Sequence, residues 1–217
     1  FSTDSRYVAT GAKDATIRIW ETATGGIWKE LESEEELIYS VAFSPDGQYL
    51  AVAGQTANLW DLASGEVTTT LAGHQSEIYS LAYSPDGTKI ATASRDTEVK
   101  IWEAETGQVL LSLSDHAMEV KKAAFNTDGS RLATASLDGT VKVWDTETGQ
   151  AIRSISSWPE QLQSVDFSPD GRQVATCSKN KIAKVWDVDS SQITLTLTGH
   201  SAAVSDIAFS SDGKTIA

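Results

Sequence analysis

Residues 73–103 read GHQSEIYSLAYSPDGTKIATASRDTEVKIWE, and the fold of the whole chain follows from this stretch. In KIATAS, Ile90, Thr92 and Ser94 alternate with alanines, and a two-residue period of this kind predicts a β-strand. The run VKIW alternates in the same way, and Ser-Pro-Asp-Gly and Arg-Asp-Thr supply turns between such runs. The stretch therefore predicts a small antiparallel meander.

The same unit recurs along the chain at a nearly fixed spacing. Its closing tryptophan returns every 40 or 42 residues, as Trp20, Trp60, Trp102, Trp144 and Trp186. Variants of the Ser-Pro-Asp-Gly turn keep step with it at residues 1–5, 43–47, 83–87, 125–129, 167–171 and 209–213. A period of this length with several short strands predicts a propeller or a solenoid. One meander cannot bury both of its faces, so neighbouring repeats must stack.

Composition limits the classes of partner. The 217 residues include 40% hydrophobic side chains, enough for a packed core, and 17 basic against 30 acidic side chains give a formal net charge of −13. Phosphate backbones and anionic lipids would repel such a domain, so we expect neither nucleic acid nor a membrane as partner. The single Cys177 excludes an internal disulfide and favours a reducing compartment, so the expected location is cytoplasmic.

Taken together, the repeated Gly-His, Ser-Pro-Asp-Gly, Ala-Ser-x-Asp and Trp-Asp elements resemble the WD-repeat family, whose members fold as β-propellers. The resemblance covers essentially the whole chain and implies an all-β propeller of four-stranded antiparallel blades. The strands of a blade are lettered a to d from the central axis outward. In the quoted repeat, strand a lies near EIYSLAYS, b near KIATAS, c near VKIW and d near QVLLSL.

Residues 1–217 are expected to form one WD-repeat domain with five repeats. The blade segments are approximately 1–32, 33–72, 73–114, 115–156 and 157–198, with a partial repeat at 199–217. WD-repeat propellers most often have seven blades, and an unclosed array exposes strand edges. We therefore expect a seven-bladed ring, completed by missing repeats or by a second chain. The alternative is a closed five-bladed ring, in which residues 203–209 would pair beside residues 7–12.

In WD-repeat proteins a His, a Ser, an Asp and a Trp form a hydrogen-bonded tetrad inside the blade. The resemblance implies two complete tetrads in this chain: His74, Ser94, Asp96 and Trp102, and His116, Ser136, Asp138 and Trp144. A nucleophilic Ser-His-Asp triad is the alternative, but its copying in successive blades without an oxyanion hole favours the structural role. Ala12, Glu34 and Gly54 stand where the network lacks a member, so their substitution is expected to matter less.

Catalytic, cofactor-binding and metal sites are all expected to be absent. The three histidines fall at the tetrad position or, for His200, at its equivalent in the last segment. Cys177 has no His or second Cys at ligand spacing, and the sequence has no GxGxxG or GxxxxGK[ST] run. We therefore expect a chain that is not an enzyme and that needs no cofactor.

Two further features leave alternatives open. The acidic run Glu34–Glu36 is either a recognition patch for a basic partner or a solvated loop, in a blade held by packing alone. Trp28 is either a partner contact or an apolar side chain that fills the outer strand.

The resemblance also implies a binding surface on the rim that carries the Gly-His loops and the turns between strands b and c. The candidate positions are Tyr39, Tyr79, Lys121 and Gln163 where strand a begins, Glu77 and Glu119 two residues earlier, and Lys13, Arg95, Leu137 and Lys179 in the turns. Tyrosine and arginine often anchor interfaces, and the mixed charges favour a peptide with basic and aromatic groups. Alternatively these are ordinary rim residues, and binding uses the outer strands or the opposite loops.

The expected function is thus a non-enzymatic scaffold that binds a protein or peptide on the propeller rim. The alternative is a sensor or regulatory WD-repeat domain of a larger signalling enzyme whose catalytic domain lies outside this chain.

Overall fold

The computed structural model describes residues 1–33, 35, 37–157 and 159–217, and all regular elements in these residues are β-strands. Glu34, Glu36 and Trp158 lie outside the described residues. The all-β prediction is confirmed, since the strands form one three-stranded and four four-stranded antiparallel sheets. In the part of the chain that is described, no helix is long and apolar enough to cross a membrane.

Each sheet is built from consecutive strands. The first contains β1 (Tyr7–Gly11), β2 (Thr16–Glu21) and β3 (Ile27–Glu32), and the second β4 (Ser40–Phe43), β5 (Tyr49–Ala53), β6 (Ala57–Asp61) and β7 (Val67–Leu71). The third contains β8 (Ile78–Tyr83), β9 (Lys89–Ser94), β10 (Val99–Glu103) and β11 (Val109–Leu113). The fourth contains β12 (Val120–Phe125), β13 (Arg131–Ser136), β14 (Thr140–Asp145) and β15 (Ala151–Ser156). The fifth contains β16 (Leu162–Phe167), β17 (Gln173–Ser178), β18 (Ala183–Asp187) and β19 (Ile193–Leu197).

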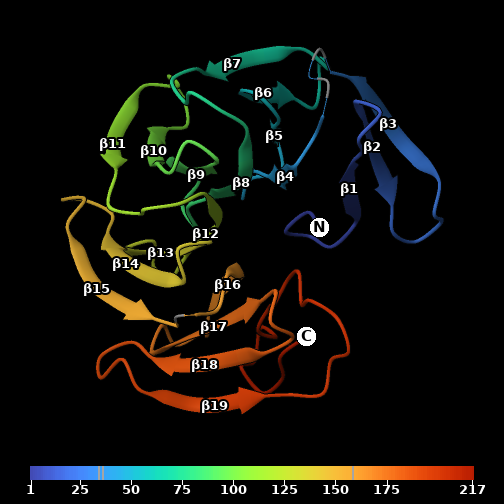
Figure 1. Cartoon of the computed structure of the whole chain (residues 1–217). Helices are drawn as coiled ribbons and strands as arrows, with labels where there is room; N and C mark the ends of the chain where they lie inside the picture. Colours follow the sequence, from blue (N-terminus) through green and yellow to red (C-terminus); the bar gives the residue numbers. More distant parts are fainter. Residues whose placement is uncertain (34, 36, 158) are drawn as a thin grey trace.

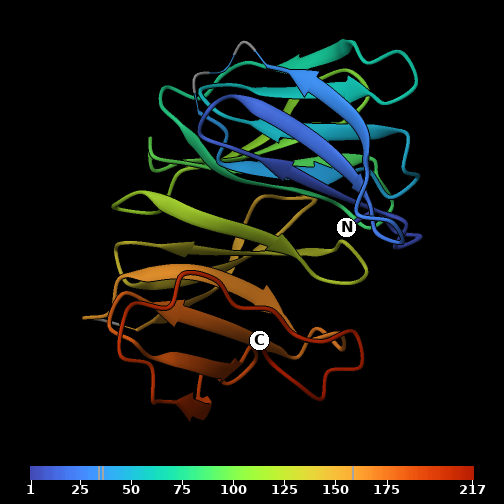
Figure 2. The ribbon, with the colours of Figure 1, turned by 90° about the vertical axis from the view of Figure 1, so that its right-hand side faces the viewer.

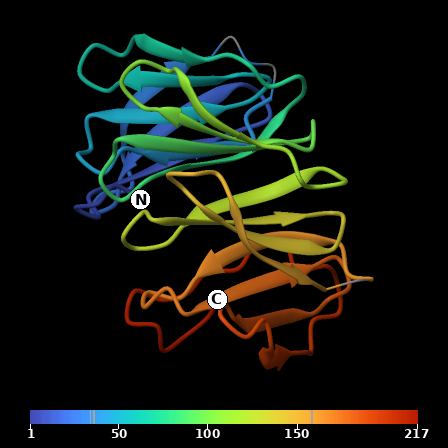
Figure 3. The same ribbon diagram turned by 90° about the vertical axis from the view of Figure 1, so that its left-hand side faces the viewer.

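The sheets are arranged as the blades of a propeller. Figure 1 shows them in an arc, with β4, β8, β12 and β16 toward the middle and β7, β11, β15 and β19 on the outside. Views from the two sides show the blades following one another from the blue to the red end of the chain (Figures 2 and 3). Neighbouring inner strands contact each other, as β4 does β8 and β12 does β16. Strand a of every four-stranded blade is therefore the inner strand.

The core lies between adjacent blades because each sheet turns an alternate set of apolar side chains toward its neighbour. One cluster joins the second blade to the third and includes the fully buried Trp102; its other buried members are Ala51, Ala53, Ala57, Leu59, Leu71, Ile78, Leu81 and Ile90. Three further clusters join the other neighbouring pairs in the same way. Stacking of repeats, as the sequence period requires, is thus what buries the apolar surface.

The turn between strands a and b has one recurring design. In the third blade the Ser84 hydroxyl donates to Asp86 at 2.5 Å and accepts the Lys89 backbone N–H at 2.9 Å. Gly87 in this turn has a φ of 75°, a conformation that glycine adopts without steric cost. The Ser-Pro-Asp-Gly sequence therefore fixes how strand b returns alongside strand a.

The closed five-bladed alternative requires residues 203–209 to pair beside residues 7–12. In the described residues β1 pairs with β2, and the last segment contains an isolated bridge between Phe209 and Ile216. The strand pair that would define a five-bladed ring is not formed between these segments. The number of blades in the complete ring stays a prediction.

Candidate functional site

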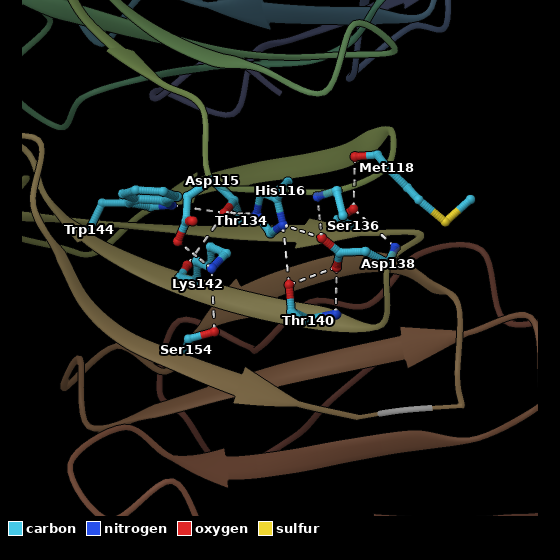
Figure 4. A network of polar contacts seen from close by, with 11 residues as sticks. Asp115, His116, Met118, Thr134, Ser136, Asp138, Thr140, Lys142, Trp144 and Ser154 are labelled. Atoms are coloured by element: carbon cyan, nitrogen blue, oxygen red, sulfur yellow. Dashed lines mark hydrogen bonds and ion pairs between the residues drawn. The ribbon is translucent and has the colours of Figure 1, made fainter.

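The fourth blade contains a buried polar relay that runs from a turn to the tryptophan (Figure 4). Nδ1 of His116 lies 3.0 Å from the Asp138 carboxylate, and Nε2 of His116 lies 2.8 Å from the Thr134 hydroxyl. The Trp144 indole N–H donates to the same hydroxyl at 2.9 Å. In the third blade the equivalent distances, among His74, Asp96, Thr92 and Trp102, are all 2.8 Å.

The hydroxyl member of the tetrad is a threonine, so the assignment of Ser94 and Ser136 to this position was wrong. In the β9–β10 ladder Trp102 pairs with Ile90, and the indole reaches the diagonal neighbour Thr92 on the same face. Ser94 lies one further step along that face. Its hydroxyl bonds the Ser76 carbonyl at 3.2 Å and accepts the Asp96 N–H at 3.1 Å. Ser136 makes the matching bonds to the Met118 carbonyl and the Asp138 N–H.

The sequence does contain a pattern that identifies the threonine of the tetrad. A threonine stands ten residues before the tryptophan in four of the five repeats: Thr10, Thr92, Thr134 and Thr176. In each of these repeats the indole N–H donates to that threonine. The fixed spacing of ten residues between this threonine and the tryptophan is the sequence feature that identifies the tetrad hydroxyl.

Burial decides the protonation state of the relay in the third blade. It lowers the pKa of His74 and outweighs the opposite effect of the Asp96 carboxylate. Burial alone would raise the pKa of Asp96, but N–H donation from Gln75, Glu98 and the His74 ring outweighs burial and lowers it. Near neutral pH, His74 is therefore a neutral ring that donates from Nδ1 to Asp96 and accepts the Thr92 hydroxyl proton at Nε2.

This protonation state predicts acid sensitivity. Unfolded chains bind a proton on His74 below about pH 6.5, whereas the folded pKa is lower, so the unfolded state binds more protons in this range. The free energy of unfolding should fall as the pH decreases from about 6.5 to about 5, above the range where carboxylates titrate. Denaturant unfolding at a series of pH values measures this pH dependence of the free energy of unfolding. A His74→Gln variant should show a shallower dependence, and an equally steep one would contradict the assignment.

In the second blade the carboxylate of Glu35 accepts backbone N–H groups, as the carboxylate of Asp96 does in the third blade. Glu35 is buried, and its carboxylate accepts the N–H groups of Gln55 at 2.6 Å and Thr56 at 3.1 Å, together with the Thr56 hydroxyl at 2.5 Å. The prediction that packing alone holds this blade was therefore wrong. Glu35 does not belong to a solvated loop or to an exposed acidic patch either, because its charge is used inside the blade.

The same blade leaves its tryptophan indole unsatisfied. The indole N–H of Trp60 is buried and has no hydrogen-bond partner among the described residues. The residue in the position of Thr92 is Val52, since Trp60 pairs with Leu50 as Trp102 pairs with Ile90. Replacement of the threonine by valine removes the acceptor, so this blade lacks the relay.

On the rim, the residues that begin strand a in three neighbouring blades meet. The Tyr39 and Tyr79 rings lie edge to face, with 5.3 Å between centroids. The Lys121 ammonium lies 3.2 Å from the centroid of the Tyr79 ring, a cation–π contact. Burial, followed by the nearby Glu119 carboxylate, raises the pKa of Tyr79 to about 12, and burial lowers the pKa of Lys121.

Arg95 links this group to the acidic rim positions. Its guanidinium lies 2.9 Å from the Glu77 carboxylate and 3.5 Å from that of Glu119. A backbone bond from Arg95 N–H to the Glu77 carbonyl, 2.9 Å, sets the turn beside the start of strand a. We call Tyr39, Tyr79, Lys121, Arg95, Glu77 and Glu119 the rim cluster.

The remaining rim candidates do not belong to the rim cluster in the same way. Leu137 is buried, so its prediction as a rim contact was wrong, although its N–H makes the equivalent backbone bond to Glu119. Lys13 and Lys179 are exposed, and Gln163 turns its amide to the Leu162 carbonyl. Beside the cluster lies a hollow of about 670 Å³ lined by Leu37, Tyr39, Glu77 and neighbouring residues of the second blade.

Six segments of the chain match the WD domain, G-beta repeat family: residues 1–21, 28–61, 65–103, 107–145, 149–187 and 191–217. The chain belongs to this family. Residues 65–103, for example, run from β7 at the outside of the second blade to β10 in the third. One sequence repeat therefore ties two neighbouring blades together. Family members typically serve as non-catalytic scaffolds for protein interaction, so proteins are the expected class of partner.

The chain is similar over short segments to several named WD-repeat proteins. It is 42% identical over 48 residues to the Lissencephaly-1 homolog of Heterostelium pallidum and 42% identical over 45 residues to the nuclear distribution protein PAC1 of Mycosarcoma maydis. It is 43% identical over 42 residues to the F-box-like/WD repeat-containing protein TBL1X of Mus musculus. These segments make up 22%, 21% and 19% of the chain, but only 12%, 10% and 8% of the relatives.

Proposed function

We propose that the chain is a non-catalytic scaffold that binds a peptide segment of a protein partner on the rim cluster. The observation that carries this proposal is the contact of Tyr39, Tyr79 and Lys121 across three successive blades. Aromatic rings held by their neighbours lose little conformational freedom on binding, which makes them effective anchors. The rigid stack of blades keeps the rings in place before the partner arrives.

The charges of the rim cluster favour a peptide with a basic and an aromatic group. Glu77 and Glu119 already hold Arg95, and the Tyr79 ring already accommodates an ammonium group. A basic partner side chain can exchange with Lys121 on the ring or with Arg95 on the carboxylates, and the displaced side chain, which is already partly exposed, turns to water. The neighbouring hollow is otherwise lined by polar residues, and in it Leu37 and Tyr39 offer apolar surface for an aromatic side chain. The cytoplasm remains the expected location.

Rim binding is tested by the double variant Tyr79→Ala plus Arg95→Glu. The loss of one anchor and the reversal of one charge should weaken partner recovery in quantitative pull-downs by more than about tenfold. The matched control is Leu110→Ala plus Arg172→Glu, which also removes one large side chain and reverses one basic charge, but on the exposed outer strand and in the opposite turn. Equal recovery of the same partners by the folded rim variant would place the binding site elsewhere.

A further inference from the structure

A pocket of about 360 Å³ lies between the second and third blades, away from the rim cluster. It opens between the outer strand β7 and the turn that joins β10 to β11. Its lining includes Thr68 and Thr69 of β7, Ala104 of the turn, and Tyr83 at the end of β8.

At the other three blade-to-blade interfaces a basic side chain of the chain itself occupies the corresponding place. Lys29 donates to the Leu62 carbonyl at 2.6 Å, Lys89 to the Thr146 carbonyl at 3.3 Å, and Arg153 to the Asp189 carbonyl at 3.2 Å. Each acceptor belongs to the turn between strands c and d of the following blade. This turn therefore presents carbonyl oxygens to a cation at each of these interfaces.

The interface between the second and third blades has the acceptor but not the donor. The residue in the place of Lys29 is Thr69, and the residue in the place of Lys89 is Tyr49; neither is basic. The side chains are also smaller here. Trp28 and Leu62 leave a pocket of only about 190 Å³ between the first two blades, whereas Thr68 and Ala104 stand in their places. The hollow between the third and fourth blades has a similar volume, about 330 Å³, but Lys89 lines it. Among the described lining residues, the lack of a basic side chain and not the volume therefore distinguishes the pocket between the second and third blades.

The polar groups of the pocket suit a cation. The Tyr83 hydroxyl is buried and has no partner among the described residues, although the other repeats carry phenylalanine at this position. Burial and the nearby Asp46 raise the pKa of Tyr83, so its oxygen keeps its proton and offers its lone pairs. The lining carboxylates are Asp46, Asp86 and Glu105, and none of the described lining residues is basic.

We propose that this pocket binds the side chain of a lysine from a protein partner. The ammonium replaces the missing Lys29 equivalent and donates to the Ala104 carbonyl within the field of the three carboxylates. A turn of the Tyr83 side chain, whose hydroxyl is buried without a partner among the described residues, adds its oxygen as a second acceptor. The alkyl stem lies along Leu59 and Ala104. Lysine is the occupant because the chain itself uses a lysine in this manner at two of the other interfaces. The pocket is a second contact, and it does not depend on the rim cluster.

The test titrates the whole chain with N-acetyl-lysine methylamide and with N-acetyl-norleucine methylamide, which has the apolar stem without the ammonium. We expect the backbone amide resonances of Thr69, Ala104 and Glu105 to shift with the lysine derivative alone. Tyr83→Phe, the residue of the other repeats, should weaken the response about tenfold. Thr69→Lys supplies the internal lysine and should abolish it. Gly107 packs against Thr69 as Gly65 packs against Lys29, so the new side chain fits the path of the old one.

Three results would overturn the proposal. They are the absence of a lysine-specific shift, an equal response to norleucine, and a response that both variants leave unchanged. Partner recovery in the rim experiment that depends on Tyr79 and Arg95 should persist in Thr69→Lys, so failure at one surface is distinguishable from failure at the other.

Discussion

Thr134→Val is expected to lower the free energy of unfolding by about 2–4 kcal/mol, because it leaves two buried polar groups, the Trp144 indole N–H and Nε2 of His116, without a hydrogen-bond partner. Valine keeps the shape of threonine, so the packing of β13 is preserved. The hydroxyl that it removes accepts the Trp144 N–H at 2.9 Å and bonds Nε2 of His116 at 2.8 Å. Denaturant unfolding measures this loss of free energy. The change is calculated from the denaturant midpoint, provided that the slope of the free energy against denaturant concentration is unchanged.

Ser136→Ala is the matched control for this substitution. The Ser136 hydroxyl lies on the same strand, but it bonds the Met118 carbonyl and the Asp138 N–H near the start of the turn. Its removal should cost about 1 kcal/mol, as for an ordinary hydrogen bond. A cost equal to that of Thr134→Val would show that the serine, and not the threonine, is the centre of the network.

The second blade supplies the reverse substitution. Val52→Thr should give the buried Trp60 indole an acceptor and raise the free energy of unfolding by about 1 kcal/mol. The new hydroxyl proton has a carbonyl to meet, that of Asn58, because the Thr134 hydroxyl lies 3.4 Å from the equivalent Lys142 carbonyl. A loss of stability in Val52→Thr would contradict the assignment of a threonine hydroxyl as the acceptor of the tryptophan indole N–H in both the second and the fourth blade.

The blade architecture could be predicted because it depends on short-range pattern. Alternation along KIATAS and VKIW, together with the turn after Tyr83, specifies strands and their order without knowledge of distant contacts. The order of the strands does not identify the residue that supplies the tetrad hydroxyl. Thr92 and Ser94 share one face of the same strand, so only the register against Trp102 separates them. That register is set by pairing, which the alternation alone does not report.

Contacts between blades could not be predicted. The sequence places Tyr39, Tyr79 and Lys121 at equivalent positions, but the cation–π contact depends on the rotation of one blade against the next. The burial of Glu35 could not be predicted either, because a run of acidic residues is ordinarily solvated. Here the short turn after β5 turns the N–H groups of Gln55 and Thr56 toward the carboxylate, and three donors offset the cost of burying it.

Gly54→Ala is expected to lower the free energy of unfolding by about 2–3 kcal/mol, because the second blade has no space for a methyl group there. A Cβ at this position would lie 2.5 Å from the Glu35 carboxylate and 2.6 Å from the Leu37 carbonyl. The carbonyl belongs to the backbone, and the carboxylate is fixed by Gln55 and Thr56, so neither can withdraw cheaply. This prediction replaces the expectation from sequence that substitution of Gly54 matters less than substitution of a tetrad residue.

The control for Gly54 separates steric overlap from backbone strain. Gly47 has a φ of 72° and nothing within 4 Å of a new Cβ, so Gly47→Ala should cost only about 1 kcal/mol through its conformation. Gly54, in contrast, is not at positive φ, so overlap is the sole source of its cost. Chemical denaturation of the two variants side by side measures the difference. If Gly54→Ala were no more destabilised than Gly47→Ala, the Glu35 carboxylate would not be packed against this glycine.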